Sequence, residues 1–442
     1  MRWNRHVAVW LGVAALMGGV VAGCGDDDEG GGGGGGGAGT EETGTTEGAK
    51  VIDPKSMDGA KGEVTFCLGK DTSGDKTALT KKFNQEFKSQ GLSAKMLEFS
   101  TSADEQRAQF VQRQEAKSGE CDVFYSDVIW TAEFASQKWL YDLTPYVKSR
   151  ESDLIPATLE SVNYDGKFWG MPQQTDAAFL YYRTDQVDKP PATWQEAYQI
   201  ASDNDGIVYQ GAPYEGLTCD FLELAFAAGG QVLSEDGKKA MIDSPENVKA
   251  LQFMVDGVKN GTAARGVTTY MEEEARRYWE SGKATFMRNW PYTYELGQKK
   301  GTKVAGKQGV MPLPEFEGAG KASILGGHNF VISVFTDNPG AALKWTDYMT
   351  QEAQQTTAFR DYAQASTLAS VYDDPAIQKK YPFAADLKQA ISQARARPVS
   401  PVYPQISQAI YKNVNEALAG RVSPEDALKT AQSEMQSALE TF

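Results

Sequence analysis

The chain has 442 residues, of which 41% are hydrophobic, and a formal net charge of −15 at pH 7. That length is too great for a single hydrophobic core and suits two domains. The acidic balance excludes a nucleic-acid-binding surface and disfavours the headgroups of anionic lipids, because both repel negative charge and no basic stripe offsets it.

The first segment, residues 1–23, has the order of a bacterial lipoprotein signal peptide. Arg2 and Arg5 precede an apolar run at 7–21, and small residues lead into Cys24. The run is shorter than the roughly 20 residues of a membrane-spanning helix, and its order fits a cleaved signal. We expect Cys24 to become the lipidated first residue of the mature chain. An ordinary secretory signal that ends in a chance cysteine is the alternative.

Residues 24–61 predict a tether between the lipid and the folded part. They contain an acidic cluster at 26–29, an unbroken glycine run at 30–37 and almost nothing apolar. Such a segment cannot bury enough surface to offset its ordering entropy, so we expect it to be disordered. The folded part would then lie at the outer face of the cell membrane, on the periplasmic side in a host that has an outer membrane.

Few residues are available for nucleophilic or zinc chemistry. His328 is the only histidine besides His6, and the sequence has neither a G-x-S-x-G motif nor a C-x-x-C spacing. Nucleophilic triads and zinc sites depend on these residue types. We therefore expect no metal and no cofactor.

The cysteines after Cys24 are Cys67, Cys121 and Cys219. An exported chain sits where disulfides form, yet three is an odd number. Cys67 lies in a strand-like run at 64–68 and Cys121 directly precedes another, so the two can be neighbours in one sheet. Two interpretations stay open: a Cys67–Cys121 bridge with Cys219 free and buried, or three small core residues.

Strand and helix patterns alternate through the first part of the folded chain. This alternation predicts a mainly parallel sheet with helices on its faces, and ligands gather at the carboxyl ends of such strands. The strands are expected at 64–68, 94–99 and 122–125, the helices at 76–88 and 104–116, and the candidate binding loops at 69–73, 100–104 and 126–130.

A second set of elements follows the turn-rich stretch 170–172. A capping box at 193–196 starts a helix that runs to about residue 203, and an apolar helix at 220–228 ends at two glycines. Further strands are expected at 178–182 and 206–209. Three cap-proline pairs predict helix starts, and the C-terminal quarter is nearly all helical; the pairs are Ser244-Pro245, Asn338-Pro339 and Ser423-Pro424.

Trp130 and Trp290 are candidates for stacking on a sugar. Both stand beside polar residues at expected element ends, whereas packing accounts for Trp139, Trp169, Trp194 and Trp345. A flat aromatic face matches the C–H face of a pyranose, and nearby Asp and Asn side chains can hold the rim hydroxyls. Two buried tryptophans without a ligand are the alternative.

Asp127 and Asp176 flank expected strands where a cleft would lie. An ionised carboxylate accepts two hydroxyl hydrogen bonds at once, although each residue taken singly fits a helix cap or a turn. We interpret the acidic run 272–274 as a solvated helix start. Glycoside hydrolases also use a pair of carboxyl groups for catalysis, so a glycoside hydrolase is an alternative interpretation of these two residues.

Several separated segments resemble the carbohydrate-binding lipoproteins of bacterial ABC importers, the extracellular solute-binding proteins of the maltose and trehalose type. These segments are 122–143, 164–185, 284–292 and 325–333, together with Arg397-Pro398 and Tyr403. The resemblance extends over nearly all of residues 62–442.

The resemblance implies an α/β fold of two lobes, the class II periplasmic-binding-protein-like fold, with a ligand cleft between lobes joined by a hinge. We expect lobe 1 at 62–174 plus 324–371 and lobe 2 at 175–323 plus 372–442. It implies a monomer that captures a sugar, a di- or oligosaccharide such as an α-glucoside, and delivers it unaltered to the transmembrane subunits of an ABC permease. A secreted glycoside hydrolase and a sensory or structural surface lipoprotein are the alternatives.

The resemblance also implies the binding positions. Asp127 would take sugar hydroxyls, Trp290 would stack on a ring, and His328 stands where the family often has tryptophan. The expected site comprises Asp71, Arg107, Asp127, Trp130, Thr175, Asp176, Trp290, Tyr292, Gly327, His328 and Arg397.

Overall fold

The computed structural model describes residues 46–441, so the expected signal peptide, Cys24 and most of the expected tether lie outside the described residues. The remainder of the tether differs from expectation. Thr46 and Ile52 are buried, Lys50 donates to the carbonyl of Val334, and the short helix η1 (Pro54–Met57) packs against α11 (Pro339–Met349). Residues 46–61 are therefore part of the folded body. Within 46–441, no helix combines the length and apolar composition that crossing a membrane requires.

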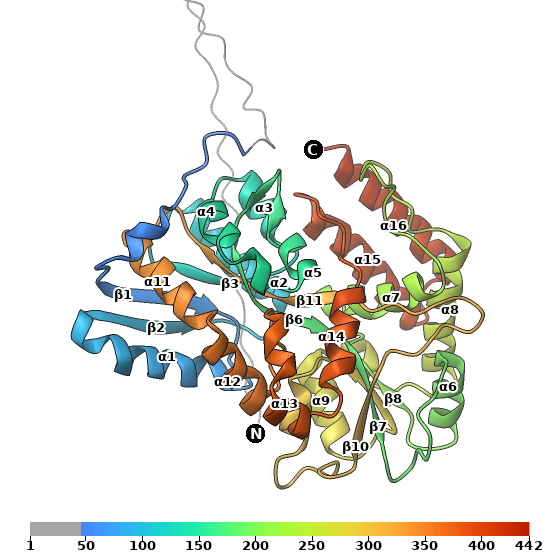
Figure 1. Cartoon of the computed structure of the whole chain (residues 1–442). Coiled ribbons are helices and arrows are strands. Elements are labelled where there is room, and N and C mark those ends of the chain that lie inside the picture. Colours follow the sequence, from blue (N-terminus) through green and yellow to red (C-terminus); the bar gives the residue numbers. More distant parts are fainter. Residues whose placement is uncertain (1–45, 442) are drawn as a thin grey trace, which may run out of the picture. The chain divides into compact units, whose positions relative to one another are not determined.

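The first sheet has five strands in the order β2-β1-β3-β11-β6, and these strands are labelled in Figure 1. β1 pairs in parallel with β2 and β3, while β11 runs antiparallel to both β3 and β6. Four strands thus share one direction, and three of them, β1, β2 and β3, are the strands that the alternating pattern predicts. The bounds are β1 (Gly62–Leu68), β2 (Leu92–Glu98), β3 (Val123–Asp127), β6 (Met171–Ala177) and β11 (Leu325–Ile332).

The second sheet has four strands in the order β10-β7-β9-β8. β7 lies between two antiparallel neighbours, and β8 pairs in parallel with β9. Their bounds are β7 (Phe179–Arg183), β8 (Ile207–Val208), β9 (Phe286–Asn289) and β10 (Gln308–Pro312), and a small hairpin is formed by β4 (Asn163–Tyr164) and β5 (Lys167–Phe168). The chain passes from the first sheet to the second at Ala178, between β6 and β7.

Helices cover both sheets, which confirms the expected α/β class (Figure 1). α1 packs on β2, α11 on β1 and β11, and α9 on β8 and β9. α15 packs against α16, α7 and α8, and α16 also packs against α8. Besides α11, the helices are α1 (Asp75–Phe87), α2 (Ala103–Glu115), α3 (Thr131–Ser136), α4 (Thr144–Lys148), α5 (Pro156–Glu160), α6 (Trp194–Ser202), α7 (Glu215–Ala227), α8 (Pro245–Lys259), α9 (Glu272–Glu280), α10 (Thr293–Gly297), α12 (Glu352–Tyr362), α13 (Pro375–Lys380), α14 (Ala384–Gln393), α15 (Tyr403–Leu418) and α16 (Pro424–Leu439).

Each of the three cap-proline pairs stands at the start of a helix, but only two of the three capping side chains accept a hydrogen bond from the first turn. Ser244 and Ser423 accept hydrogen bonds from backbone N–H groups in the first turns of α8 and α16. Asn338 precedes α11 without capping it, and its side-chain amide donates to the carbonyl of Lys61. The apolar helix expected at 220–228 is α7, which begins earlier, at Glu215.

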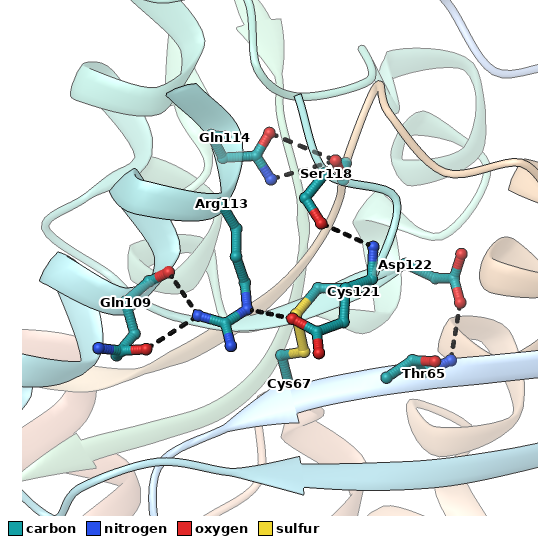
Figure 2. The surroundings of a disulfide bond; sticks show 10 residues. Thr65, Cys67, Gln109, Arg113, Gln114, Ser118, Cys121 and Asp122 are labelled. Atoms are coloured by element: carbon teal, nitrogen blue, oxygen red, sulfur yellow. Dashed lines mark hydrogen bonds and ion pairs between the residues drawn. A yellow bond between two sulfur atoms is a disulfide. The ribbon is translucent and has the colours of Figure 1, made fainter. Parts of the chain in front are cut away.

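Cys67 and Cys121 form a disulfide that joins β1 to the segment before β3 (Figure 2). Their Cα atoms are 5.8 Å apart, and both residues are buried beside Phe110 and Phe124. Next to the bridge, Asp122 accepts from the backbone N–H of Thr65 at 2.7 Å. Of the two open interpretations, the structure thus has the bridge, with Cys219 free and buried.

Candidate functional site

A cavity of about 210 Å³ lies at the carboxyl ends of β1 and β3, where the sequence predicts binding loops. Residues of the first sheet and its loops line one part, and residues around α7, α9 and β9 line another. The lining residues comprise 68–73, 75, 76, 101, 103, 106, 125, 127, 174, 176, 214–216, 219, 271–273, 290, 292, 326–328, 364 and 397.

The antiparallel register of β11 brings several site residues into one row. His328 lies opposite Asp127 on β3 and opposite Gln174 on β6, and Gly326 lies opposite Asp176. Gly327 has φ +120°, and a Cβ there would lie 2.2 Å from the carbonyl oxygen of Gln174. Only glycine fits this approach of two backbones, so the fixed register depends on Gly327.

Arg397 joins Asp127 to Glu215, the first residue of α7. Its Nη1 donates to Glu215 Oε1 at 2.6 Å, and its Nη2 lies 3.3 Å from Asp127 Oδ1. Glu215 also accepts from Tyr403 and Ser407. Burial raises the pKa of Glu215, and the Arg397 charge opposes that rise. Arg397 therefore connects the carboxyl end of β3 in the first sheet to the first residue of α7.

Asp127 retains hydrogen-bonding capacity for a ligand. Oδ1 accepts from the backbone of Ile129 at 3.2 Å and from Arg397, and the carboxylate side chain is 14% exposed. Burial raises the pKa of Asp127, while Arg397 opposes the rise. With Oδ1 held by the protein, Oδ2 is the oxygen available to accept from a sugar hydroxyl.

Asp176 is an acidic residue of the cavity whose carboxylate is only partly hydrogen-bonded by the protein. Its Oδ2 accepts from Gln174 at 2.9 Å, whereas Oδ1 is buried without a protein partner. The residue is 5% exposed, and burial raises its pKa to about 7. A buried acceptor without a partner is costly, so a donor from a ligand would stabilise this end of the cavity.

His328 stacks on Tyr125 rather than standing free. The ring centroids are 4.2 Å apart with an interplanar angle of 9°, and the Lys76 ammonium lies 4.8 Å from the Tyr125 centroid. Burial, with the charges of Lys76 and Arg397, lowers the pKa of His328 to about 3. The imidazole is therefore neutral at physiological pH, and its Nδ1 has no protein partner.

Trp290 and Tyr292 follow β9 and line the cavity. The Tyr292 hydroxyl donates to Glu273 at 2.8 Å. The backbone carbonyl of Trp290 accepts from the Tyr181 and Thr293 hydroxyls, both at 2.9 Å. The backbone that presents the indole to the cavity is thus fixed from two sides.

The interpretation of 272–274 as a solvated helix start is only partly correct. These residues do begin α9, but Glu272 and Glu273 line the cavity. Burial raises the pKa of Glu272, beside Tyr214 and Trp290. The sequence pattern of a charged first turn gives no sign that the turn faces a cavity.

The structure does not bring every expected site residue to the cavity. Trp130 is 2% exposed and packs among Phe110 and Phe134, Thr175 is buried outside the lining, and Arg107 forms an ion pair with Glu133. The residues at the cavity are Asp71, Asp127, Asp176, Trp290, Tyr292, Gly327, His328 and Arg397.

Asp71 lines the cavity but is largely occupied by the start of α1. Its Oδ1 accepts from the backbone of Gly74 at 3.0 Å, and its Oδ2 accepts from the backbone of Thr77 at 2.8 Å and from the Thr77 hydroxyl. Asp71 therefore shapes the loop after β1 more than it offers a free acceptor.

The lining residues outside the expected set include Lys76, Tyr125, Gln174, Glu215 and Gln364. Tyr125 and Gln174 lie on the strands that carry Asp127 and Asp176, so strand alternation could have indicated them. Gln364 has a buried Oε1 without a protein partner, and no local pattern identifies it. In residues 46–441, no group of three or more His, Cys, Asp and Glu side chains is arranged to hold a metal.

Residues 70–356 match the model of the family described as bacterial extracellular solute-binding protein. A relative from Deinococcus radiodurans, named "Probable ABC transporter-binding protein", is 34% identical over 368 residues, which is 79% of this chain and 87% of the relative.

Two of the similar solved structures each cover 85% of this chain. The maltose-bound MalE3 of T. maritima has a TM-score of 0.81 and 36% identity, over 85% of this chain and 99% of that one. A solute-binding protein of an ABC transporter from Thermotoga lettingae, bound with α-D-tagatose, has a TM-score of 0.78 and 26% identity, over 85% and 99%.

Proposed function

The chain belongs to the family of bacterial extracellular solute-binding proteins, and from this premise we propose that it is the sugar-binding component of an ABC importer. The two-lobed α/β fold is that of its structural neighbours. The similar T. maritima protein is bound to maltose, which supports a saccharide ligand here. A di- or oligosaccharide such as an α-glucoside remains the proposed ligand.

The chemistry of the cavity supports a sugar. The observation that supports a sugar ligand most directly concerns Asp176. This buried carboxylate has one oxygen without a protein partner, and it lines the same cavity as Trp290. Gln364 offers a second buried acceptor, and Asp127 offers a third. A ligand rich in hydroxyl donors and with an apolar ring face satisfies both the acceptors and the indole.

The proposed mechanism is capture without covalent change. We propose the lobes as 62–174 plus 324–371 and 175–323 plus 372–442, with a ligand favouring the closed form only by contacts it makes to both. Moving such a hinge from mostly open to mostly closed takes roughly 3 to 5 kcal/mol. One ring stack at about 1 kcal/mol and several hydrogen bonds at about 1 kcal/mol each supply that difference.

The membrane context is proposed from the sequence. A lipid on Cys24 would hold the monomer at the outer face of the membrane, next to the transmembrane subunits of the permease. The closed, loaded form would dock there and release the sugar. Globomycin treatment of expressing cells, which blocks lipoprotein signal cleavage, should leave a longer precursor; a C24A variant found in the medium would agree with the anchor.

The experiment that tests sugar binding is calorimetry on the purified folded part. A thermal-shift panel of maltose, trehalose, maltotriose and α-D-tagatose selects the ligand, and titration then gives its affinity. We expect D176N and W290A each to weaken binding at least tenfold. D256N is the matched control, since it makes the same change on the exposed side of α8. Saturating sugars that leave both melting temperature and heat unchanged would contradict the proposal.

The glycoside hydrolase alternative predicts a different product. A hydrolase needs one protonated and one ionised carboxyl group, and Asp176, with its pKa raised to about 7 by burial, is the candidate acid. We propose instead that the bound sugar leaves intact. Incubation of the protein with maltose for a day, followed by NMR of the released sugar, should find maltose alone; glucose would establish the hydrolase.

A further inference from the structure

The ring of Trp290 is held by protein on one face and at one edge. Arg288 lies two residues earlier, at the end of β9, and alternate residues of a strand share a face. The Arg288 guanidinium carbon is 4.2 Å from the Trp290 ring centroid. At the ring edge, a Cβ on Gly326 would lie 2.9 Å from Cζ3. The opposite face of the indole is therefore the one left for a ligand.

Arg288 is itself fixed by groups on α7 and after β8. Nε donates to Glu223 Oε2 at 2.8 Å, Nη2 donates to the other oxygen of that carboxylate, and Nη1 donates to Gln210 Oε1 at 2.7 Å. Asp220, one turn before Glu223, lies 3.3 Å from Nε. The Gln210 amide donates back to the Arg288 carbonyl at 3.2 Å. The plane of the guanidinium is thus defined by at least three hydrogen bonds.

Stability alone gives little reason for a charge network at this depth. The Arg288 side chain is 2% exposed and that of Glu223 is 1% exposed. Buried ion pairs often contribute no more stability than apolar residues of the same volume. A planar guanidinium, however, stacks on an aromatic ring and bonds carboxylate and amide groups in its own plane, which an ammonium cannot do.

We propose that Arg288 is a positioning residue for the ligand. Fixed by Glu223 and Gln210, it holds the plane of Trp290 before the ligand arrives, so that binding does not have to order the indole. This inference rests on the proposed function in one respect, that a sugar ring stacks on the free face of Trp290. Arg288 itself does not line the cavity.

A double-mutant cycle on maltose affinity tests the inference. R288K keeps the charge but loses the planar stack, and we expect it to weaken binding about tenfold. In the W290A background the same substitution should change the dissociation constant less than twofold. R183K is the matched control: Arg183 lies on β7 of the same sheet and pairs with Asp185, and we expect no effect on affinity. Equal weakening by R288K with and without Trp290 would overturn the inference.

A second readout does not depend on any sugar. In protein labelled with 5-fluorotryptophan, the ¹⁹F resonance that W290F removes belongs to Trp290. We expect R288K to shift or broaden this resonance and R183K to leave it unchanged; an unchanged resonance in R288K would overturn the positioning role. Absence of sugar binding by the wild-type protein would overturn the proposed function, and the ¹⁹F result would still decide whether Arg288 fixes the ring.

Q210M covers the case in which R288K fails to fold. It removes the Gln210 bonds to Arg288, leaves the ion pair with Glu223 in place and conserves side-chain volume. We expect about threefold weaker maltose binding and a shifted Trp290 resonance, and no effect of Q210M on affinity when W290A is also present. Retention of both the affinity and the resonance would contradict the inference.

Discussion

Reduction of the Cys67–Cys121 disulfide should cost the protein a large part of its stability. The bridge spans 54 residues of sequence, a segment that includes β2 and α2. Cross-linking a loop of that length removes entropy from the unfolded chain worth about 4 kcal/mol at 25 °C. Both sulfurs lie in a buried cluster, so cleavage also leaves two thiols that must fit the same space.

The assay is urea unfolding of the oxidised and the reduced protein, followed by circular dichroism. We expect the free energy of unfolding to fall by about 3 to 5 kcal/mol on reduction. In the C67A/C121A variant, reductant should have no effect. C219A, which removes the free buried cysteine, should keep the full response to reductant, since Cys219 takes no part in the bridge.

The result that would refute this reasoning is specific. A loss below about 1 kcal/mol on reduction would mean that the unfolded chain is already restricted between β1 and β3, so that the loop-entropy relation does not apply. A full response that persists in C67A/C121A would assign the effect to another disulfide.

Three further variants separate packing, charge and binding. W130A should cost about 3 to 5 kcal/mol of stability, because Trp130 is buried in an aromatic cluster, while the sugar affinity stays within threefold in calorimetry. The pKa of Asp176 is about 7 when folded and 3.8 when unfolded, so the folded state binds more protons between these values. The stability of the wild type relative to D176N, measured by urea unfolding at pH 5, 6 and 7, should therefore rise by about 1 kcal/mol per pH unit as the pH falls. The pKa of His328 moves the opposite way, from 6.5 to about 3, so stability relative to H328Q should fall by about 1 kcal/mol per unit below pH 6.5 in the same series; no difference in pH slope would mean that the imidazole is protonated in the folded protein.

Three strands of the first sheet and one edge of the site could be predicted from sequence because they follow from local periodicity. Alternation of short apolar runs with amphipathic helices defines β1, β2 and β3 and places their carboxyl ends together. Asp71 and Asp127 come from these ends. A residue that directly follows one of these parallel strands can therefore be placed at this edge of the sheet from the sequence alone.

Residues that meet through long-range packing could not be predicted in this way. Trp130 and Trp290 both stand next to polar residues at element ends, yet Trp130 turns into the aromatic cluster of Phe110 and Phe134, while Trp290 faces the cavity. The difference arises from which neighbours fill the space behind each ring. Glu215 is a second case, because its partner Arg397 lies 182 residues away.

A β-bulge explains how two successive glutamines reach the same phenol in this site. β6 is an edge strand, a position in which proline is tolerated, and its register against β11 shifts between His328 and Asn329. At a bulge, two residues of one strand oppose one residue of the other. Consistent with this, the Tyr125 hydroxyl lies 2.8 Å from Gln173 Oε1 and 2.5 Å from Gln174 Oε1, a pair that a regular strand would send to opposite faces.

The bulge also determines which side chains of β6 face the cavity. Side chains alternate between the two faces of a strand. Without the extra residue, a regular ladder after Pro172 would therefore turn Gln174 and Asp176 to the opposite face of the sheet and bring their neighbours to the cavity face. Thr175, which the resemblance assigns to the site, would then face the cavity and Asp176 would leave it. The extra residue on β6 is thus the physical reason that Asp176, and not Thr175, lies beside Trp290.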